Sequence, residues 1–238
     1  MSVKAGQDHT CFLTKSGSVL TCGWSADGQL GQEMFTLNAI PKKVNGDIQG
    51  VKIKEIATKC DFVLALDTQG ELYGWGNNEY KQLAMCGSTE PQIGVARHLN
   101  LPNYIKKPIL KIAASGTHCM LIDSDKKVWV WGFGLLGKGP KCDEAIEPQQ
   151  IPDTLFGKYS EISHTMERQP ISVNCGLNSS AVTLDDGSLY MWGKNKYGNL
   201  GTGDELDYYL PIRINIPASV KKIDCGPDHT LVIAKTYI

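Results

Sequence analysis

The chain has 238 residues, with 24 Lys and Arg against 25 Asp and Glu, so its formal net charge is −1. A balance this even argues against a surface that follows the phosphates of duplex DNA or RNA, because such surfaces usually need a basic stripe. No apolar run approaches the ~20 residues of a membrane-spanning helix, so no transmembrane segment is expected. The length suits one domain or two small ones.

The first ten residues, MSVKAGQDHT, show neither the apolar core of a secretory signal nor the Arg-rich pattern of a transit peptide, so no targeting peptide is visible. They lead directly into a segment with two short apolar runs around a polar turn, AGQDHTCFLTKSGSVLTCG. Runs of this kind, with turn residues where the chain must reverse, predict an antiparallel hairpin. Three further segments along the chain have the same pattern.

Each hairpin ends at a glycine that anchors a common motif, as in CGWSADGQLGQ and WGKNKYGNLGTG. The four anchors are separated by 53, 56 and 61 residues. They are Gly23, Gly76, Gly132 and Gly193. Downstream, short segments that begin at Pro41, Pro148 and Pro211 are expected to add an edge-like strand. A unit of this length with several short strands and no long helix is typical of a propeller blade.

We therefore predict an all-β propeller that forms a single, incomplete domain over residues 1–238, with four complete units and one further strand. The repeats are expected at about 1–53, 54–109, 110–170 and 171–220, with a partial unit at 221–238. Residues 84–108 and 152–170 interrupt the repeat. Such insertions lie on a propeller's faces, either as solvated connections or as binding loops.

The eight cysteines include no C-x-x-C pair, so a zinc site is not expected. Several lie in apolar runs, where Cys behaves as a small buried hydrophobe. Reduced core thiols are therefore favoured over a disulfide framework, and they indicate an intracellular compartment.

The stretch WGFGLLGKG, which begins at Trp131, matches a dinucleotide fingerprint and most of a phosphate-binding loop. However, Gly132 and Gly137 are the repeat counterparts of Gly193 and Gly198, and no helix pattern follows. Gly139 also stands where a phosphate-binding loop needs Ser or Thr. The sequence therefore predicts a blade turn here, and no nucleotide or other cofactor.

His9, His118 and His229 occupy one repeat position, and two roles fit them. A His that recurs in this way can tie a blade to its neighbour through hydrogen bonds, or it can contact a partner. His98 and His164 stand alone and are expected to be solvated. No nucleophile elbow and no ligand spacing are present, so neither a catalytic residue nor a metal site is expected.

The pattern G-x-D-H-T, a hairpin, and then W-G-x-N-x-x-G-x-L-G resembles the regulator of chromosome condensation repeat family. The motifs GWGNNEYKQLA and CGPDHTLVIAKTYI are most similar to a mitochondrial, exchange-factor-like branch of that family. The resemblance implies a seven-bladed propeller of which this chain would be the C-terminal part. It also implies a protein without hydrolytic or redox chemistry of its own that promotes GDP release from a small or dynamin-like mitochondrial GTPase. Any membrane contact would be peripheral, and a cytoplasmic location is the alternative.

The resemblance assigns GTPase contact to the acidic and histidine positions of the G-x-D-H turns. By position these are Asp8, His9, Asp61, His118, Asp228 and His229. In the later insertion, Phe156, Tyr159 and Arg168 are residue types that are enriched at interfaces, and they are candidates for a partner loop. The alternative is a scaffold propeller that binds mitochondrial proteins or ribosomal RNA; the near-neutral charge disfavours RNA.

Overall fold

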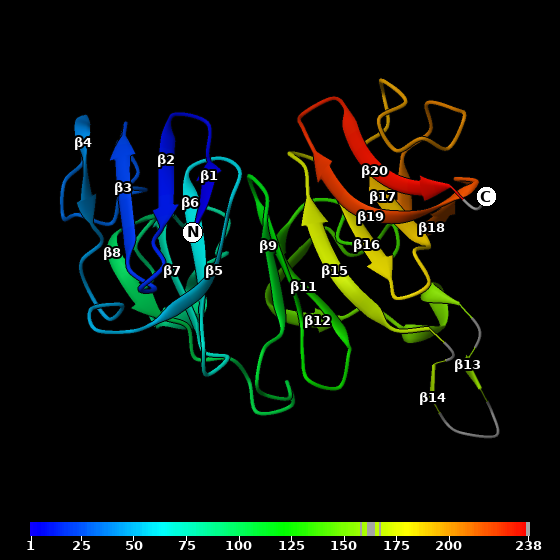
Figure 1. Ribbon diagram of the computed structural model, residues 1–238, viewed down its shortest axis with the longest axis horizontal. Helices are drawn as coiled ribbons and strands as arrows, with labels where there is room; N and C mark the ends of the chain where they lie inside the picture. Colours follow the sequence, from blue (N-terminus) through cyan, green and yellow to red (C-terminus); the bar gives the residue numbers. More distant parts are fainter. Residues whose placement is uncertain (158, 161–164, 167, 237–238) are drawn as a thin grey trace.

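The computed structural model describes residues 1–157, 159–160, 165–166 and 168–236. Within these residues the chain is almost entirely β, with four four-stranded antiparallel sheets and two two-stranded ones (Figure 1). In each sheet the strands follow one another in chain order. This arrangement confirms the predicted all-β propeller class.

The first sheet holds β1 (Ser2–Ala5), β2 (His9–Leu13), β3 (Val19–Gly23) and β4 (Asn38–Lys43). The second holds β5 (Ile53–Thr58), β6 (Phe62–Asp67), β7 (Leu72–Asn77) and β8 (Gln92–His98). The third holds β9 (Lys111–Ala114), β10 (His118–Ile122), β11 (Val128–Phe133) and β12 (Glu144–Gln150). The fourth holds β15 (Pro170–Cys175), β16 (Ser179–Leu184), β17 (Leu189–Gly193) and β18 (Tyr208–Ile214).

The remaining elements are short or incomplete. The last sheet has β19 (Ala218–Cys225) and β20 (Thr230–Thr236), and a small hairpin pairs β13 (Tyr159–Ser160) with β14 (Thr165–Met166). Two 3-10 turns complete the list, η1 (Ala84–Cys86) and η2 (Asp153–Phe156).

Three sequence-based expectations need correction. The final unit has two strands and not one, because residues 218–225 pair with β20. Residues 84–108 are not simply an insertion, since they contain β8, the fourth strand of the second sheet. Pro41, Pro148 and Pro211 lie inside β4, β12 and β18 and do not begin them. Proline is tolerated there because an outermost strand pairs on one side only.

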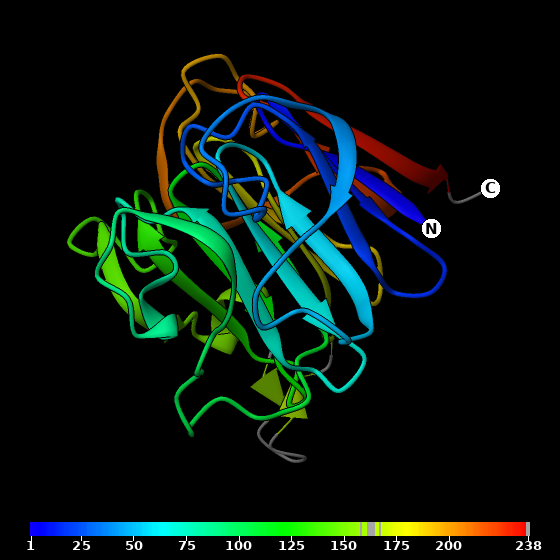
Figure 2. The ribbon, with the colours of Figure 1, turned by 90° about the vertical axis from the view of Figure 1, so that its left-hand side faces the viewer.

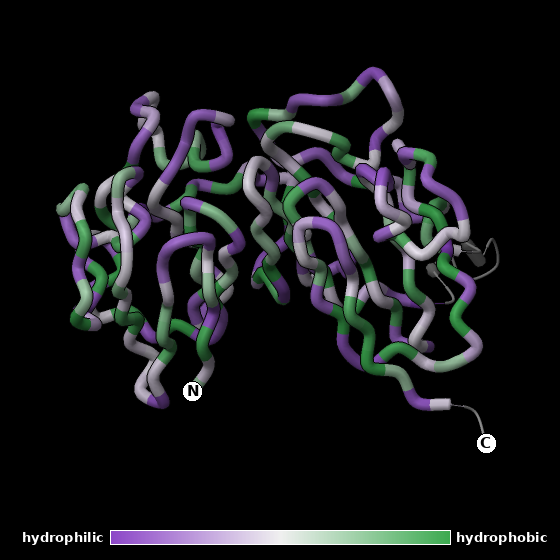
Figure 3. Tube along the Cα trace, turned by 90° about the horizontal axis from the view of Figure 1, so that it is seen from above, coloured by the Kyte–Doolittle hydropathy of each residue, from purple (hydrophilic) through white to green (hydrophobic). Residues whose placement is uncertain are grey.

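The first strands of the sheets line a shared inner groove, from which the sheets extend as blades. A hollow of about 520 Å³ is lined by residues of β1, β5, β9, β15 and β19. Across it, Nζ of Lys59 lies 2.9 Å from Oδ1 of Asp224, which joins the second sheet to the last. Viewed from above, the N-terminus and the last described residues of the chain lie toward the same side of the molecule (Figure 3).

Neighbouring sheets pack face to face, with their strands running in similar directions (Figure 2). Trp75, Trp131 and Trp192 are completely buried between them. The indole of Trp75 donates to the carbonyl of Gln29 at 3.0 Å, and that of Trp131 to the carbonyl of Gln82 at 2.8 Å. In both cases the acceptor belongs to the preceding sheet, so each ring fastens one blade to the next.

The loop after each anchor glycine reaches a left-handed backbone position five residues later. The residue there is glycine in three loops, whereas in the second sheet it is Lys81, with a φ of 60°. At Gly137 a Cβ atom would lie 2.7 Å from Nε1 of Trp192, so glycine is also required for packing against the next blade. Among the described residues, no helix has both the length and the apolar character needed to cross a bilayer.

Candidate partner-binding face

The turns after the first strand of each sheet and the loops after its third strand lie at one end of the molecule, because successive strands run in opposite directions. In Figure 1 this end is at the top. We call it the turn face. Its turns are residues 6–8, 59–61, 115–117, 176–178 and 226–229, and its loops are residues 24–37, 78–91, 134–143 and 194–207.

The structure places the predicted Asp residues on the turn face. Asp8 is exposed and Asp61 is half-buried. Partial burial raises the pKa of Asp61, and the nearby carboxylates of Asp27 and Asp8 raise it further, against a hydrogen bond of 3.3 Å from Nε2 of Gln29. The three carboxylates therefore form a region of concentrated negative charge on the first two sheets.

Asp228 and His229 lie at the other side of the same face, and both are exposed. They help to line a hollow of about 380 Å³ between the fourth sheet and the last hairpin. The hollow and the three carboxylates around Asp8 belong to different sheets. The predicted contact residues therefore form two separate groups on the turn face.

His118 is buried between the third and fourth sheets and joins them. Oγ of Ser115 accepts hydrogen bonds from the backbone N–H groups of Thr117 and His118, so its proton is free to be donated to Nδ1 of His118, 2.7 Å away. Nε2 then carries the ring proton and donates it to Oγ of Ser180 at 2.8 Å. Burial lowers the pKa of His118 to about 4, so the ring is neutral.

His9 makes the corresponding connection between the first and second sheets. Its Nε2 lies 3.1 Å from Oγ1 of Thr58, which donates its own proton to the carbonyl of Phe62. Burial lowers the pKa of His9 to about 4. The structure therefore places His9 and His118 as buried ties between blades.

The three candidates from the later insertion lie at the opposite end of the strands, where Figure 1 shows the β13–β14 hairpin. Phe156 is completely buried and packs edge-on against Tyr190, with ring centroids 5.6 Å apart, so it does not present its ring to a partner. Nε of Arg168 pairs with Asp186 at 2.9 Å. Tyr159 contributes its backbone to β13, and its side chain lies outside the described part of the structure.

The WGFGLLGKG stretch forms the end of β11 and the loop that leads to β12. Gly132 has a φ of 103°, and a Cβ atom there would lie 2.3 Å from the carbonyl oxygen of Thr117. The anchor glycines of the other three complete sheets make the same close approach to their own turns. These glycines are thus explained by packing, and a strand follows the loop where a phosphate-binding motif needs a helix.

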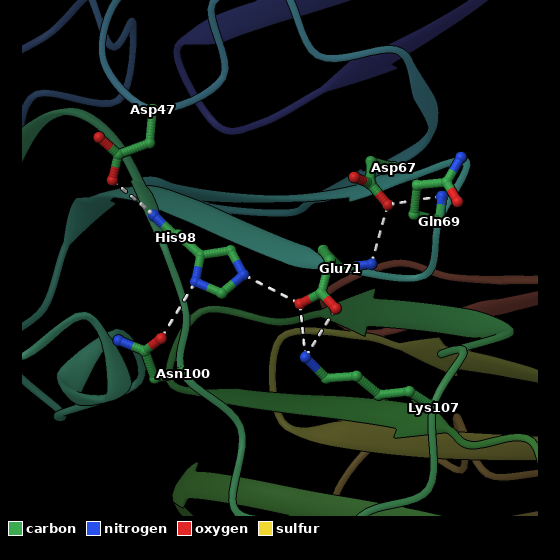
Figure 4. A network of polar contacts seen from close by, with 7 residues as sticks. All are labelled: Asp47, Asp67, Gln69, Glu71, His98, Asn100 and Lys107. Atoms are coloured by element: carbon green, nitrogen blue, oxygen red, sulfur yellow. Dashed lines mark hydrogen bonds and ion pairs between the residues drawn. The ribbon is translucent and has the colours of Figure 1, made fainter.

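His98, expected to be solvated, instead belongs to a polar network at the end opposite the turn face (Figure 4). Its Nε2 lies 2.9 Å from Oε2 of Glu71, and its backbone N–H donates to Asp47 at 3.0 Å. Nζ of Lys107 also contacts Glu71, at 2.5 Å. The network ties the connectors on either side of the second sheet to that sheet. His164 lies outside the described residues.

Replacing Glu71 with Gln is expected to lower the free energy of unfolding by about 1–2 kcal/mol at pH 7. Burial alone would raise the pKa of Glu71, but hydrogen bonds and positive charge from Lys107 and His98 outweigh it and lower this pKa. The stabilisation is therefore present above the ordinary Glu pKa and is lost as the pH falls through the lowered one. Urea unfolding at a series of pH values below 7 measures the difference in unfolding free energy between the parent and the variant, with Glu79→Gln as an exposed control. A difference that does not narrow as the pH falls contradicts this account.

The eight cysteines are all free within the described residues. Burial raises the pKa of the Cys119 and Cys175 thiols well above the ordinary value and that of Cys225 to about 12. These thiols are thus protonated and unreactive at neutral pH, as expected for core cysteines.

Sequence reasoning missed a set of exposed aromatic rings on the turn face. In each complete sheet an exposed ring stands one to four residues after the anchor glycine: Trp24, Tyr80, Phe133 and Tyr197. Phe35, farther along the first loop, is exposed as well. The rings of Tyr80 and Phe133 stack across the second and third sheets, with centroids 5.6 Å apart and planes at 24°. The signal in the sequence was the recurrence of an aromatic residue just after the anchor, at a position that shifts between repeats.

Comparison with protein families finds the regulator of chromosome condensation (RCC1) repeat. One sequence model of this repeat matches residues 69–122 and 186–233, and a second matches residues 2–29, 53–82 and 171–199. Together the two models cover more than half of the chain.

Among curated proteins, the RCC1-like G exchanging factor-like protein of Mus musculus is 41% identical over 238 residues, and the protein of the same name in Homo sapiens is 40% identical. Each match covers all of this chain and 50% of the relative. The mitochondrial RCC1 domain-containing protein RUG3 of Arabidopsis thaliana is 26% identical over 226 residues, which is 92% of this chain and 47% of that protein. The chain thus spans about half the length of the curated relatives it matches.

Among solved structures, human WBSCR16 is 40% identical and superposes with a TM-score of 0.94, over 100% of this chain and 58% of that one. Prp20p of Saccharomyces cerevisiae is 21% identical with a TM-score of 0.78, over 100% of this chain and 56% of that one. The second likeness shows the fold alone.

Proposed function

Because this chain belongs to the regulator of chromosome condensation repeat family, we propose that it forms part of an exchange factor that binds a mitochondrial GTPase and promotes the release of GDP. The observation that carries the proposal is the identity of about 40% along the whole chain to proteins named as RCC1-like G exchanging factor-like. The name of the Arabidopsis relative supports the mitochondrial location. The solved structure of Prp20p was reported together with its binding to Gsp1p and histones, which supports a protein partner.

The chemistry that such a protein must supply is modest. An exchange factor accelerates GDP release when it binds the nucleotide-free GTPase more tightly than the GDP-bound form, because this differential affinity stabilises the state through which GDP leaves. About 1.4 kcal/mol of difference corresponds to a tenfold change. The factor needs no nucleotide site of its own, in keeping with the blade turn formed by WGFGLLGKG.

The exposed carboxylates of the turn face suit this task. Asp8 and Asp228 have solvent-exposed side chains at turns of the first and last sheets, and Asp61 lies between them on the second. Carboxylates at the rim of an interface steer a cationic partner and set its orientation. We propose that these three residues and His229 contact the GTPase, whereas His9 and His118 support the turns from within.

Release of a fluorescent GDP analogue tests the proposal. The intact protein, mixed with small and dynamin-like mitochondrial GTPases in turn, is expected to accelerate release from one of them at least about tenfold. Asp8→Asn combined with Asp228→Asn is expected to remove most of this acceleration while the thermal midpoint stays within about 2 °C.

Asp125→Asn provides the control, because Asp125 is an exposed carboxylate in the β10–β11 hairpin at the opposite end. It is expected to leave exchange unchanged. Binding to a GTPase without any acceleration of GDP release contradicts the exchange function and favours a scaffold.

A further inference from the structure

We propose that the turn face holds its GTPase through the row of aromatic rings Trp24, Tyr80, Phe133 and Tyr197, and that the partner surface it fits carries Lys or Arg around an apolar patch. This inference rests on the proposed function and adds to it the residues that anchor the partner and the chemistry of the surface they recognise. The anchors are distinct from the Asp and His positions of the turns.

The distribution of exposed rings singles out this face. The four rings are between 39% and 61% exposed, and each comes from a different sheet. Single exposed apolar residues are ordinary on a protein surface, so their concentration is the informative feature. In the described hairpins and connectors at the opposite end, Tyr104 is the only large hydrophobic side chain that is exposed to a similar degree.

The middle two rings border a hollow that an inserted side chain can occupy. Tyr80 and Phe133 line a hollow of about 330 Å³ that spans the second, third and fourth sheets. Its other side chains include Leu135 and Asn178 and one charge of each sign, from Asp143 and Lys194. Aromatic residues beside a pocket that excludes water are the residue type and setting in which binding energy concentrates. The stacked pair also holds its geometry before binding, which reduces the entropy lost when a partner docks.

The charge around the rings identifies the partner's chemistry. The turns and loops of the turn face contain eleven Asp and Glu against six Lys, a formal charge of −5, whereas the whole chain carries −1. Lys194 pairs with Asp207 on this face, at 2.8 Å. On the first two sheets, repulsion from Asp27 and Asp8 adds to the raised pKa of Asp61, because these carboxylates lie close together. A face of this kind attracts a positively charged protein surface and repels nucleic acid.

The test compares a double variant with a matched control. Tyr80→Ala with Phe133→Ala removes the stacked pair of the turn face. Tyr104→Ala removes an exposed ring that stacks in the same way on Trp129, with centroids 5.4 Å apart and planes at 30°, at the opposite end. Dissociation constants of the intact proteins for the nucleotide-free GTPase are measured by biolayer interferometry, with the thermal midpoint as the folding check.

The double variant is expected to bind at least about tenfold more weakly, mainly through faster dissociation, and Tyr104→Ala is expected to bind within about twofold of the parent. Added salt is expected to slow association for all three proteins. If the parent accelerates GDP release and the double variant binds equally well, the aromatic proposal is overturned and the exchange function stands. If the double variant loses binding but the parent never accelerates GDP release, the proposal that the aromatic rings bind the GTPase is supported. The proposed exchange function is then contradicted. If the parent binds no GTPase, both are overturned.

Discussion

Acidification from pH 7 to pH 4.5 is expected to destabilise the fold by roughly 2–3 kcal/mol through each of the two buried histidines. Burial lowers the pKa of His9 and of His118 to about 4, below the ordinary value of 6.5. The unfolded chain therefore binds protons that the folded chain rejects. Stability contributed in this way is fully present above pH 6.5, is lost progressively as the pH falls below 6.5, and is gone once the pH has fallen through about 4.

The double variant His9→Gln and His118→Gln removes both titrating groups. It is expected to be less stable than the parent at pH 7, because the bonds to Thr58 and Ser180 change, but to lose less stability on acidification. Urea unfolding at a series of pH values measures both effects. His229→Gln is the control, because His229 is exposed. A double variant with the same pH dependence as the parent contradicts the role of these residues as neutral ties.

Trp131→Ala is expected to lower the free energy of unfolding by about 3–5 kcal/mol. The substitution leaves a cavity between the second and third sheets, and the carbonyl of Gln82 loses its donor. A loss of this size is a large share of the total stability of an ordinary domain, so partial unfolding at 37 °C is expected.

Trp24→Ala gives the comparison, because Trp24 is a large aromatic residue at the surface of the first sheet. It is expected to change the free energy of unfolding by less than about 0.5 kcal/mol. Equal losses from the two substitutions, measured by chemical denaturation, contradict the assignment of Trp131 to the interface between blades.

The strands around each anchor glycine were predictable, because each hairpin has two short apolar runs separated by a recognisable polar turn. The first strands were harder to see. β19, with the sequence ASVKKIDC, borders the inner groove and carries adjacent lysines, so its pattern is not clearly apolar. β8, with the sequence QIGVARH, was taken for part of an insertion. Its residues show no regular alternation of apolar and polar side chains, in keeping with the irregular burial along the strand.

The candidate site also contains residues whose place was predictable from the sequence and residues whose place was not. Recurrence at one repeat position allowed His9, His118 and His229 to be either ties between blades or partner contacts. The structure shows His9 and His118 as ties, whereas His229 is exposed. Phe156 is of a residue type that is enriched at interfaces. However, it lies at the end of η2, where its ring is buried in the core against Tyr190. The rings Tyr80 and Phe133 escaped notice because they stand four residues and one residue after their anchors, and only the folded loops bring them together.

The most direct test of the central claim is the ratio of two dissociation constants, for the GDP-bound and the nucleotide-free forms of the GTPase whose GDP release the intact protein accelerates. An exchange factor is expected to bind the nucleotide-free form at least about tenfold more tightly, and Asp8→Asn with Asp228→Asn is expected to weaken that binding. Equal dissociation constants for the two forms would contradict the proposed function, because a ligand without differential affinity shifts no equilibrium.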